Sequence, residues 1–108
     1  MKDLNVTEEM ILWAVWKLRE NAYGVTIRKR LSDVTGRVFP YGTIYGVLAK
    51  FHRQGLVNQR VGGHSPVRGG RKKNFYLITP KGLSALKEAV ELKKVLWNNE
   101  SELALLES

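Results

Sequence analysis

The chain has 108 residues, of which 44% are hydrophobic and 26% charged, and it carries a formal net charge of +8 and no cysteine. A chain of this length forms one domain with a single modest core, and its hydrophobic content argues against disorder. The lack of cysteine excludes disulfides and thiolate metal sites, and no apolar run approaches the roughly 18 residues that a membrane-spanning helix needs. We therefore expect a soluble, cytoplasmic protein without a secretion signal.

The charge is concentrated in the middle of the chain. Residues 21–87 hold thirteen Lys or Arg residues and one acid, Asp33, which gives this segment a formal charge of +12. The first twenty residues contribute −1 and residues 88–108 contribute −3. A basic middle between two mildly acidic ends favours binding of a polyanion, and the usual polyanion is nucleic acid.

The first predicted helix begins at an Asn5 or Thr7 cap and runs to about residue 20, with two glutamates in the first turn, where the helix dipole favours acids. The residues that share its core face at a 3.6-residue period are Ile11, Ala14, Val15 and Leu18. Leu12 and Trp16 form a second apolar stripe, and Trp13 lies farther round. A single small core does not need all of this surface, so we expect a partner to cover part of it.

Two further helices are predicted before the chain turns to strands. A break at residues 23–24 precedes a helix over about 26–35, which ends at Gly36 and whose inward face consists of Ile27, Leu31 and Val34. A third helix over about 42–54 ends at Gly55, and its core stripe consists of Ile44, Val47, Leu48 and Phe51.

The second half of the chain begins with two short predicted strands, over about 56–61 and 73–78. About eleven glycine-rich, basic residues join them, which is typical of a hairpin with a long loop, or wing. Thr79 and Pro80 then form a cap and first turn for a last helix that reaches at least Trp97.

This order of elements predicts an α+β, mostly α fold: a winged helix-turn-helix with three helices, a two-stranded wing and a C-terminal dimerisation helix. We expect a DNA-binding domain over residues 5–79 and a dimerisation helix over 80–98. Residues 99–108 form a tail whose order the sequence leaves open.

The outward face of the third predicted helix has the composition of a DNA-reading surface. Small residues, Gly42, Gly46 and Ala49, run along its centre and would let the backbone approach a major groove, with polar side chains on both flanks. The alternative is that the glycines are incidental to a solvated helix face. The candidate DNA-binding residues are Arg28 and Lys29 on the second helix, Tyr41, Thr43, Tyr45, Lys50 and Arg53 on the third, and His64, Arg68, Arg71, Lys72 and Lys73 on the wing.

No constellation of residues indicates catalysis. His52 and His64 lie in different elements with few acids around them, so neither a metal site nor a nucleophile–base pair is expected. The paired glycines of the wing match no phosphate-binding loop. We therefore expect a non-enzymatic protein without a cofactor or metal.

The last predicted helix is apolar over about half of its circumference, whereas one-sided packing needs a stripe of only about 100°. This surplus predicts a twofold homodimer, although burial of the helix in its own monomer remains an alternative. In a dimer the two reading helices would enter major grooves about 34 Å apart on a palindromic site. The candidate interface residues are Trp13, Trp16, Leu86, Ala89, Val90, Leu92, Leu96 and Trp97.

Three stretches of the sequence resemble the PadR-like family of winged-helix transcriptional regulators, and the likeness covers about residues 8–97. They are Tyr23-Gly24 with Ile27; Gly42-Thr43-Ile44-Tyr45 through Gly55-Leu56-Val57; and Gly69-Gly70-Arg71-Lys72-Lys73-Asn74-Phe75-Tyr76 into Thr79 and Gly82. The resemblance implies a homodimeric repressor whose third helix lies in the major groove while the wing contacts the backbone. By position, Thr43, Tyr45 and Lys50 match the family's recognition helix, and Arg71 to Lys73 match its basic second wing strand.

The sequence also departs from the family pattern. Gly46 stands where proline is frequent, His52 where an acid is frequent, and Leu77 where Arg is often found, which leaves the sequence preference open. Short members of the family can hold flat aromatic compounds between tryptophans at the dimer centre. Here Trp97 falls about one turn beyond the matching place, near Lys93, so a small aromatic effector is a hypothesis beside plain interface packing.

Three alternatives to a simple repressor follow from the same residues. The winged helix could dock on an acidic protein partner as an interaction module, or respond to a small molecule and control efflux or stress genes. RNA binding would require exposed aromatics for stacking unpaired bases, for which Phe75 is the candidate. Binding of a specific duplex and not of its scrambled version separates DNA recognition from docking on a protein.

Overall fold

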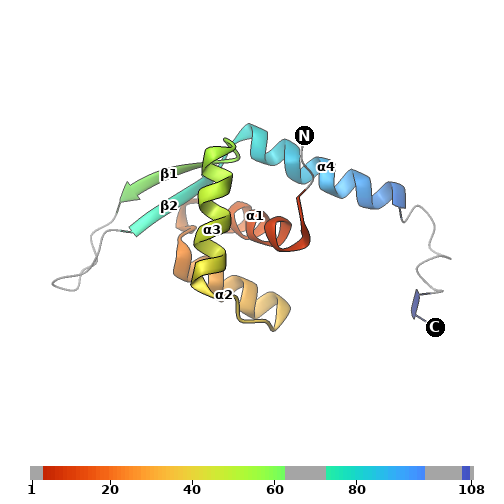
Figure 1. Ribbon diagram of the computed structural model, residues 1–108, viewed down its shortest axis with the longest axis horizontal. Helices are drawn as coiled ribbons and strands as arrows, with labels where there is room; N and C mark the ends of the chain where they lie inside the picture. The colour runs from red at the N-terminus through yellow and green to blue at the C-terminus, as the bar shows by residue number, and fades with distance from the viewer. Residues whose placement is uncertain (1–3, 63–72, 97–105, 108) are drawn as a thin grey trace.

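The computed structural model describes residues 4–62, 73–96 and 106–107 of the chain. Three helices come first: α1 (Val6–Leu18), α2 (Gly24–Thr35) and α3 (Tyr41–Arg53), with a short 3-10 turn (Arg19–Asn21) between α1 and α2. Strands β1 (Val57–Gly62) and β2 (Lys73–Ile78) follow, and α4 (Pro80–Leu96) comes last (Figure 1). The predicted winged helix-turn-helix, α+β and mostly α, is confirmed.

The helix boundaries follow from local capping. The Glu8 backbone N–H donates to Asn5 Oδ1 (2.8 Å) and the Asn5 N–H donates back to Glu8 Oε1 (2.9 Å), so Asn5 and not Thr7 caps α1. Helix α2 begins two residues earlier than predicted, at Gly24, because the Tyr23 N–H donates to the Thr26 hydroxyl (3.0 Å) ahead of it. It ends at the predicted glycine.

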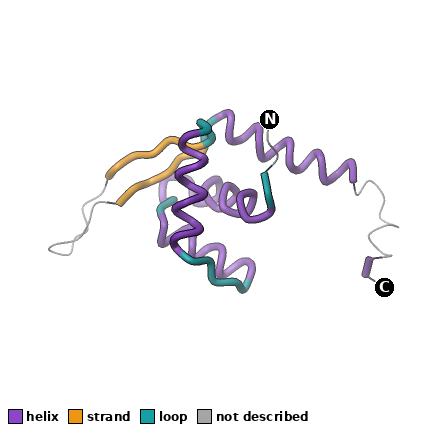
Figure 2. Tube along the Cα trace, in the orientation of Figure 1, coloured by secondary structure: helices purple, strands orange, loops and turns teal. Residues whose placement is uncertain are grey.

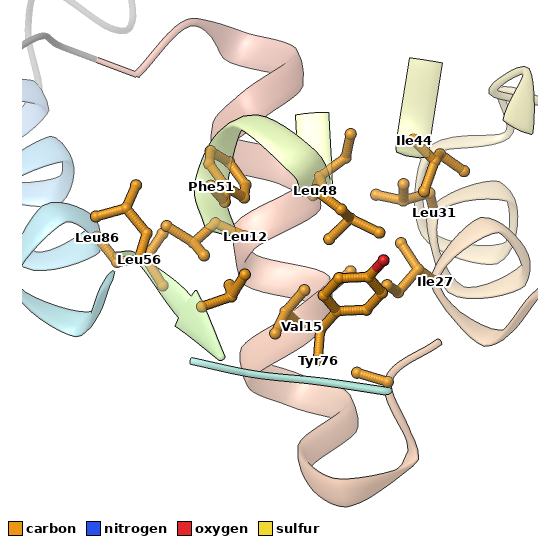
Figure 3. Close-up of a cluster of buried hydrophobic side chains, with 14 of the residues drawn as sticks. Leu12, Val15, Ile27, Leu31, Ile44, Leu48, Phe51, Leu56, Tyr76 and Leu86 are labelled. Atoms are coloured by element: carbon orange, nitrogen blue, oxygen red, sulfur yellow. The ribbon is translucent and has the colours of Figure 1, made fainter. Parts of the chain in front are cut away.

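The core lies where α1, α2, α3 and the sheet meet (Figure 3). Leu12, predicted to belong to surplus apolar surface, is fully buried in this core and needs no partner. The prediction that Val34 points inward is wrong. Val34 is 68% exposed, because the buried residues of α2 end one turn earlier at Leu31. The largest fully buried side chains are Phe51, Ile11, Leu12, Ile27, Ile44, Leu48, Val15 and Val57.

The two strands form an antiparallel hairpin in which Val57 pairs with Ile78 and Gly62 with Lys73. The base of this wing is fixed to the helices, since the Tyr76 N–H donates to the carbonyl of Ala22 (2.9 Å). The wing extends away from the helical body, on the side opposite the end of α4 (Figures 1 and 2).

The buried residues of α4 all lie in its first half, namely Gly82, Ala85 and Leu86. From Glu91 onward every described residue of α4 is exposed. Among the described residues, the helices lack the combination of length and hydrophobicity that a membrane crossing requires.

Candidate nucleic-acid interface

Helix α3 divides into two faces as predicted. Ile44, Leu48 and Phe51 are fully buried, and this anchors the helix rigidly on the core. The opposite face is exposed and consists of Gly42, Thr43, Tyr45, Gly46, Ala49 and Arg53. A fixed helix that presents a smooth, small-residue surface with polar flanks can enter a DNA groove without first rearranging.

Two tyrosines one turn apart dominate one flank of this face. The rings of Tyr41 and Tyr45 stack with centroids 6.0 Å apart and planes 20° apart. They remain accessible, with 37% of Tyr41 and 46% of Tyr45 exposed. Arg28, predicted to contact phosphate, lies against this pair: its guanidinium carbon is 4.4 Å from the Tyr41 ring centroid, and its Nε donates to the carbonyl of Phe39 (3.0 Å). Arg28 therefore stabilises the segment that leads into α3.

The other flank carries Lys50, whose side chain is 40% exposed and whose ammonium forms an ion pair within the same chain. Lys50 Nζ lies 2.5 Å from Oε2 of Glu8 on α1, and that carboxylate is largely buried. Lys29, likewise a predicted phosphate contact, pairs with Asp33 at 3.0 Å on the exposed surface of α2. The charges of both lysines are thus partly compensated by carboxylates of the same chain.

The wing base adds cations stacked on aromatic rings. Lys73 Nζ lies 4.5 Å from the Tyr23 ring centroid and donates to the Tyr23 hydroxyl (3.4 Å). Phe75 packs edge-on against Tyr23, with ring centroids 5.3 Å apart, and the Arg60 guanidinium carbon lies 5.2 Å from the Phe75 centroid. Of the predicted wing contacts, His64, Arg68, Arg71 and Lys72 fall outside the described residues.

Arg60 is a candidate that the sequence analysis missed. It is exposed on β1 directly opposite Phe75 in the strand register, and cross-strand partners on one face interact. Pairing the two predicted strands residue by residue could have found it.

The wing and α3 contact neighbouring residues at the start of α2, Tyr23 and Gly24. Tyr23 contacts Lys73 on the wing, and the next residue, Gly24, lies directly under the ring of Tyr45 on α3. A cationic strand and the exposed helix α3 are therefore close to each other, as binding of one duplex by both would require.

A second, apolar surface lies between α1 and α4. Trp13 and Trp16 of α1 line an open groove of about 300 Å³, with the remaining walls formed by Leu83, Leu86, Lys87, Val90 and Glu91 of α4. Leu86, predicted for the dimer interface, is only 2% exposed and is already used by the core of its own chain. Leu92 and Leu96 are 48% and 64% exposed, Ala89 and Val90 are half-buried, and Trp97 falls outside the described residues.

Two ion pairs link α1 to its neighbouring helices. Beside the Glu8–Lys50 pair to α3, Lys93 of α4 donates to both carboxylate oxygens of Glu9, each at 2.5 Å. Within the described ranges, no three His, Cys, Asp or Glu side chains gather as a metal site would require.

The three-helix core, the two-stranded wing and the exposed α3 define a winged helix-turn-helix DNA-binding protein. The chain belongs to the PadR-like family of transcriptional regulators, whose family model matches residues 12–88. No curated protein matches it.

Solved structures share the whole architecture. A PadR-like transcriptional regulator from Bacillus cereus is similar at a TM-score of 0.72 and 24% identity, covering 92% of this chain and 91% of that one. A PadR-family transcriptional regulator from Eggerthella lenta is similar at 0.71 and 26% identity, covering 91% and 83%. A PadR-like transcription factor from Bacteroides fragilis gives 0.72 and 22%, covering 90% and 88%.

Proposed function

We propose that this protein is a transcriptional repressor that binds a palindromic operator as a homodimer. Residues 5–79 would form the DNA-binding unit and residues 80–98 the dimerisation helix. The observation that carries the proposal is that the exposed helix α3 and the cationic wing base both contact residues 23 and 24 and therefore lie close together.

In this arrangement α3 lies in the major groove and reads bases. Thr43 and Tyr45 project from the flanks of its exposed face, whereas Gly42 and Gly46 leave the backbone bare between them. The Thr43 hydroxyl can donate to or accept from base edges, and the exposed part of the Tyr45 ring can pack against them. Arg53, exposed in the last turn, is placed to contact a phosphate.

The wing supplies binding energy that does not depend on sequence. Lys73 and Arg60 lie on its two strands, and the predicted contacts Arg71 and Lys72 directly precede Lys73. Each phosphate that a cation neutralises releases counterions, so a dimer that contacts roughly 6–10 phosphates should lose affinity steeply as salt rises.

The homodimer is supported by the apolar surface that a single chain leaves open. Trp13 and Trp16 line a groove beside α4, and the exposed Leu92, Val95 and Leu96 continue the apolar surface to the end of that helix. A twofold axis near α4 would bring each groove against the other copy's helix and bury both. Two α3 helices one helical turn apart would then read the two halves of a palindrome.

The test of this proposal separates sequence reading from charge. A duplex selected by the protein from a random-sequence library and a scrambled duplex of equal composition are titrated at several salt concentrations. Thr43→Ala and Tyr45→Ala should lower affinity for the selected duplex alone, by roughly tenfold each. The Arg71, Lys72 and Lys73 triple alanine variant should weaken both duplexes alike and flatten the salt dependence.

Three outcomes would count against the proposal. Equal affinity of the wild-type protein for both duplexes would favour docking on a protein partner. A wing variant with full affinity would remove the wing from the interface. A monomeric solution mass at tens of micromolar would exclude the twofold site. A reporter gene behind the selected duplex tests repression, which requires that expression rise when the protein is absent.

The groove also supports a second candidate function, a response to a small aromatic effector. Its walls are mostly apolar, and two tryptophan rings can stack on a flat compound. Quenching of tryptophan fluorescence by a flat aromatic dye, lost in Trp13→Ala, would support this function. Unchanged DNA affinity at saturating dye would contradict it.

A further inference from the structure

Helix α3 makes a close contact with a residue that carries no side chain. Gly24, the first residue of α2, is buried beneath Tyr45. A Cβ atom placed on Gly24 would come within 2.6 Å of Tyr45 Cζ and 2.8 Å of Cε1, and closer still to the hydroxyl oxygen. The outer half of the Tyr45 ring therefore occupies the space in which any other residue at position 24 would place its side chain.

The same ring is held on two further sides. Tyr41 stacks on it and is itself covered by Arg28, which lies one turn beyond Gly24 on α2. The hydroxyl end lies near Tyr76: burial raises the pKa of Tyr76, and the neighbouring Tyr45 raises it further. Tyr45 is thus 46% exposed, while its hydroxyl end packs against Gly24 and its ring stacks with Tyr41.

We propose that Gly24 is a positioning residue for DNA recognition: by leaving room for Tyr45, it fixes the orientation in which that tyrosine meets the base edges. The proposal rests on the reading role of α3 proposed above. It adds a specificity determinant on α2, a helix that would otherwise contribute only to the scaffold and to phosphate contacts. Gly24 would act without touching DNA itself.

A methyl group on Gly24 should move the tyrosine and leave the helices in place. The backbone of Gly24 has no positive φ, so alanine fits its conformation, and alanine is the better helix former. The atoms that the methyl group would meet belong to the far end of a long side chain, which can rotate away at little cost. Gly24→Ala is therefore a change in the orientation of Tyr45 within an intact domain.

The experiment is a double-variant cycle with the selected and scrambled duplexes. Gly24→Ala, Tyr45→Ala, the double variant and the control Val25→Ala, an exposed residue on the same turn of α2, are compared by duplex affinity and melting temperature. We expect Gly24→Ala to weaken the selected duplex roughly tenfold, as the loss of one base contact does, and to leave the scrambled duplex unchanged. The double variant should bind as Tyr45→Ala does, and Val25→Ala should bind as the wild type.

The possible failures are distinguishable. If Tyr45→Ala costs specific affinity and Gly24→Ala does not, the positioning role is refuted and the reading role stands. If Tyr45→Ala has no effect, the reading role of Tyr45 fails first. Additive losses in the double variant would show that Gly24 acts through something else. If Gly24→Ala lowers the melting temperature, Tyr45→Ala should restore it, and a loss that persists in the double variant would refute the steric argument.

Discussion

Replacing Gly46 with alanine should make the protein more stable and bind DNA more weakly. Gly46 lies in the middle of α3, where glycine costs roughly 1 kcal/mol relative to alanine. Nothing lies within 4 Å of the position that its Cβ would occupy, so the substitution meets no steric penalty. The free energy of unfolding should therefore rise by about 1 kcal/mol, which corresponds to about 4–8 °C in melting temperature for a domain of this size.

The methyl group should be unfavourable only for DNA binding. If the bare backbone of α3 lies against the groove floor, a methyl group at Gly46 separates the two surfaces, and steric overpacking of this kind costs roughly 1–3 kcal/mol. Affinity for the selected duplex should then fall by about tenfold. Thermal denaturation followed by circular dichroism measures the first effect, and titration of a labelled duplex measures the second.

Ser84→Ala is the matched control, because Ser84 is exposed on α4 and the substitution also raises helix propensity. It should raise the melting temperature slightly without changing DNA affinity. A Gly46→Ala protein that is more stable and binds DNA as tightly as the wild type would refute the close approach of α3, and its glycines would then be incidental to a solvated face.

Four other substitutions test packing, ion pairs and titration. Gly82→Ala should lower the free energy of unfolding by about 1–3 kcal/mol, since its methyl group would collide with a backbone carbonyl that cannot move aside, and an unchanged melting temperature would contradict this packing. Lys93→Ala should lower the free energy of unfolding by about 1–2 kcal/mol, because it leaves the largely buried Glu9 unpaired. Lys94→Ala breaks an exposed pair and should lower it by less than about 0.5 kcal/mol. Equal effects of the two substitutions in urea denaturation would argue against the Glu9 contact. Burial raises the pKa of Tyr76 above 10.0, so the stability tied to its protonated form is present below pH 10 and is lost as the pH rises through the higher folded-state pKa. Tyr76→Phe should reduce this alkaline loss in melting temperature, and an unchanged pH profile would contradict the assignment.

Much of the fold could be predicted because local signals and the apolar pattern agree. Gly36 ends α2 with a φ of 73°, and Pro40 directly precedes α3 as its N-cap residue. The core stripe of α3 and the bounds of β2 follow directly from residue spacing. Gly24 was misplaced outside α2, since a glycine after an aromatic residue also fits a break. The Thr26 hydroxyl accepts from the Tyr23 N–H and the Ile27 N–H donates to the Tyr23 carbonyl, so the helix has already begun at Gly24.

The sequence predicted which helix face the site residues occupy, but not which residues they contact. Periodicity placed Tyr45 and Lys50 on the outer surface of α3, but it carries no information about residues distant in sequence. The ion-pair partner of Lys50 is Glu8, 42 residues away, and the residue against which Tyr45 packs is Gly24. Val34 shows the complementary limit, since an apolar period continues past the point where a small domain has any core left to cover it.

Because Glu8 and Glu9 are consecutive, the first turn of α1 forms ion pairs with two distant parts of the chain. Neighbouring residues on a helix point about 100° apart, so one carboxylate reaches α3 while the next reaches α4. Asn5 is the N-cap residue of that turn. A truncation that removes this asparagine would therefore weaken both ion pairs at once, although Asn5 lies in neither α3 nor α4.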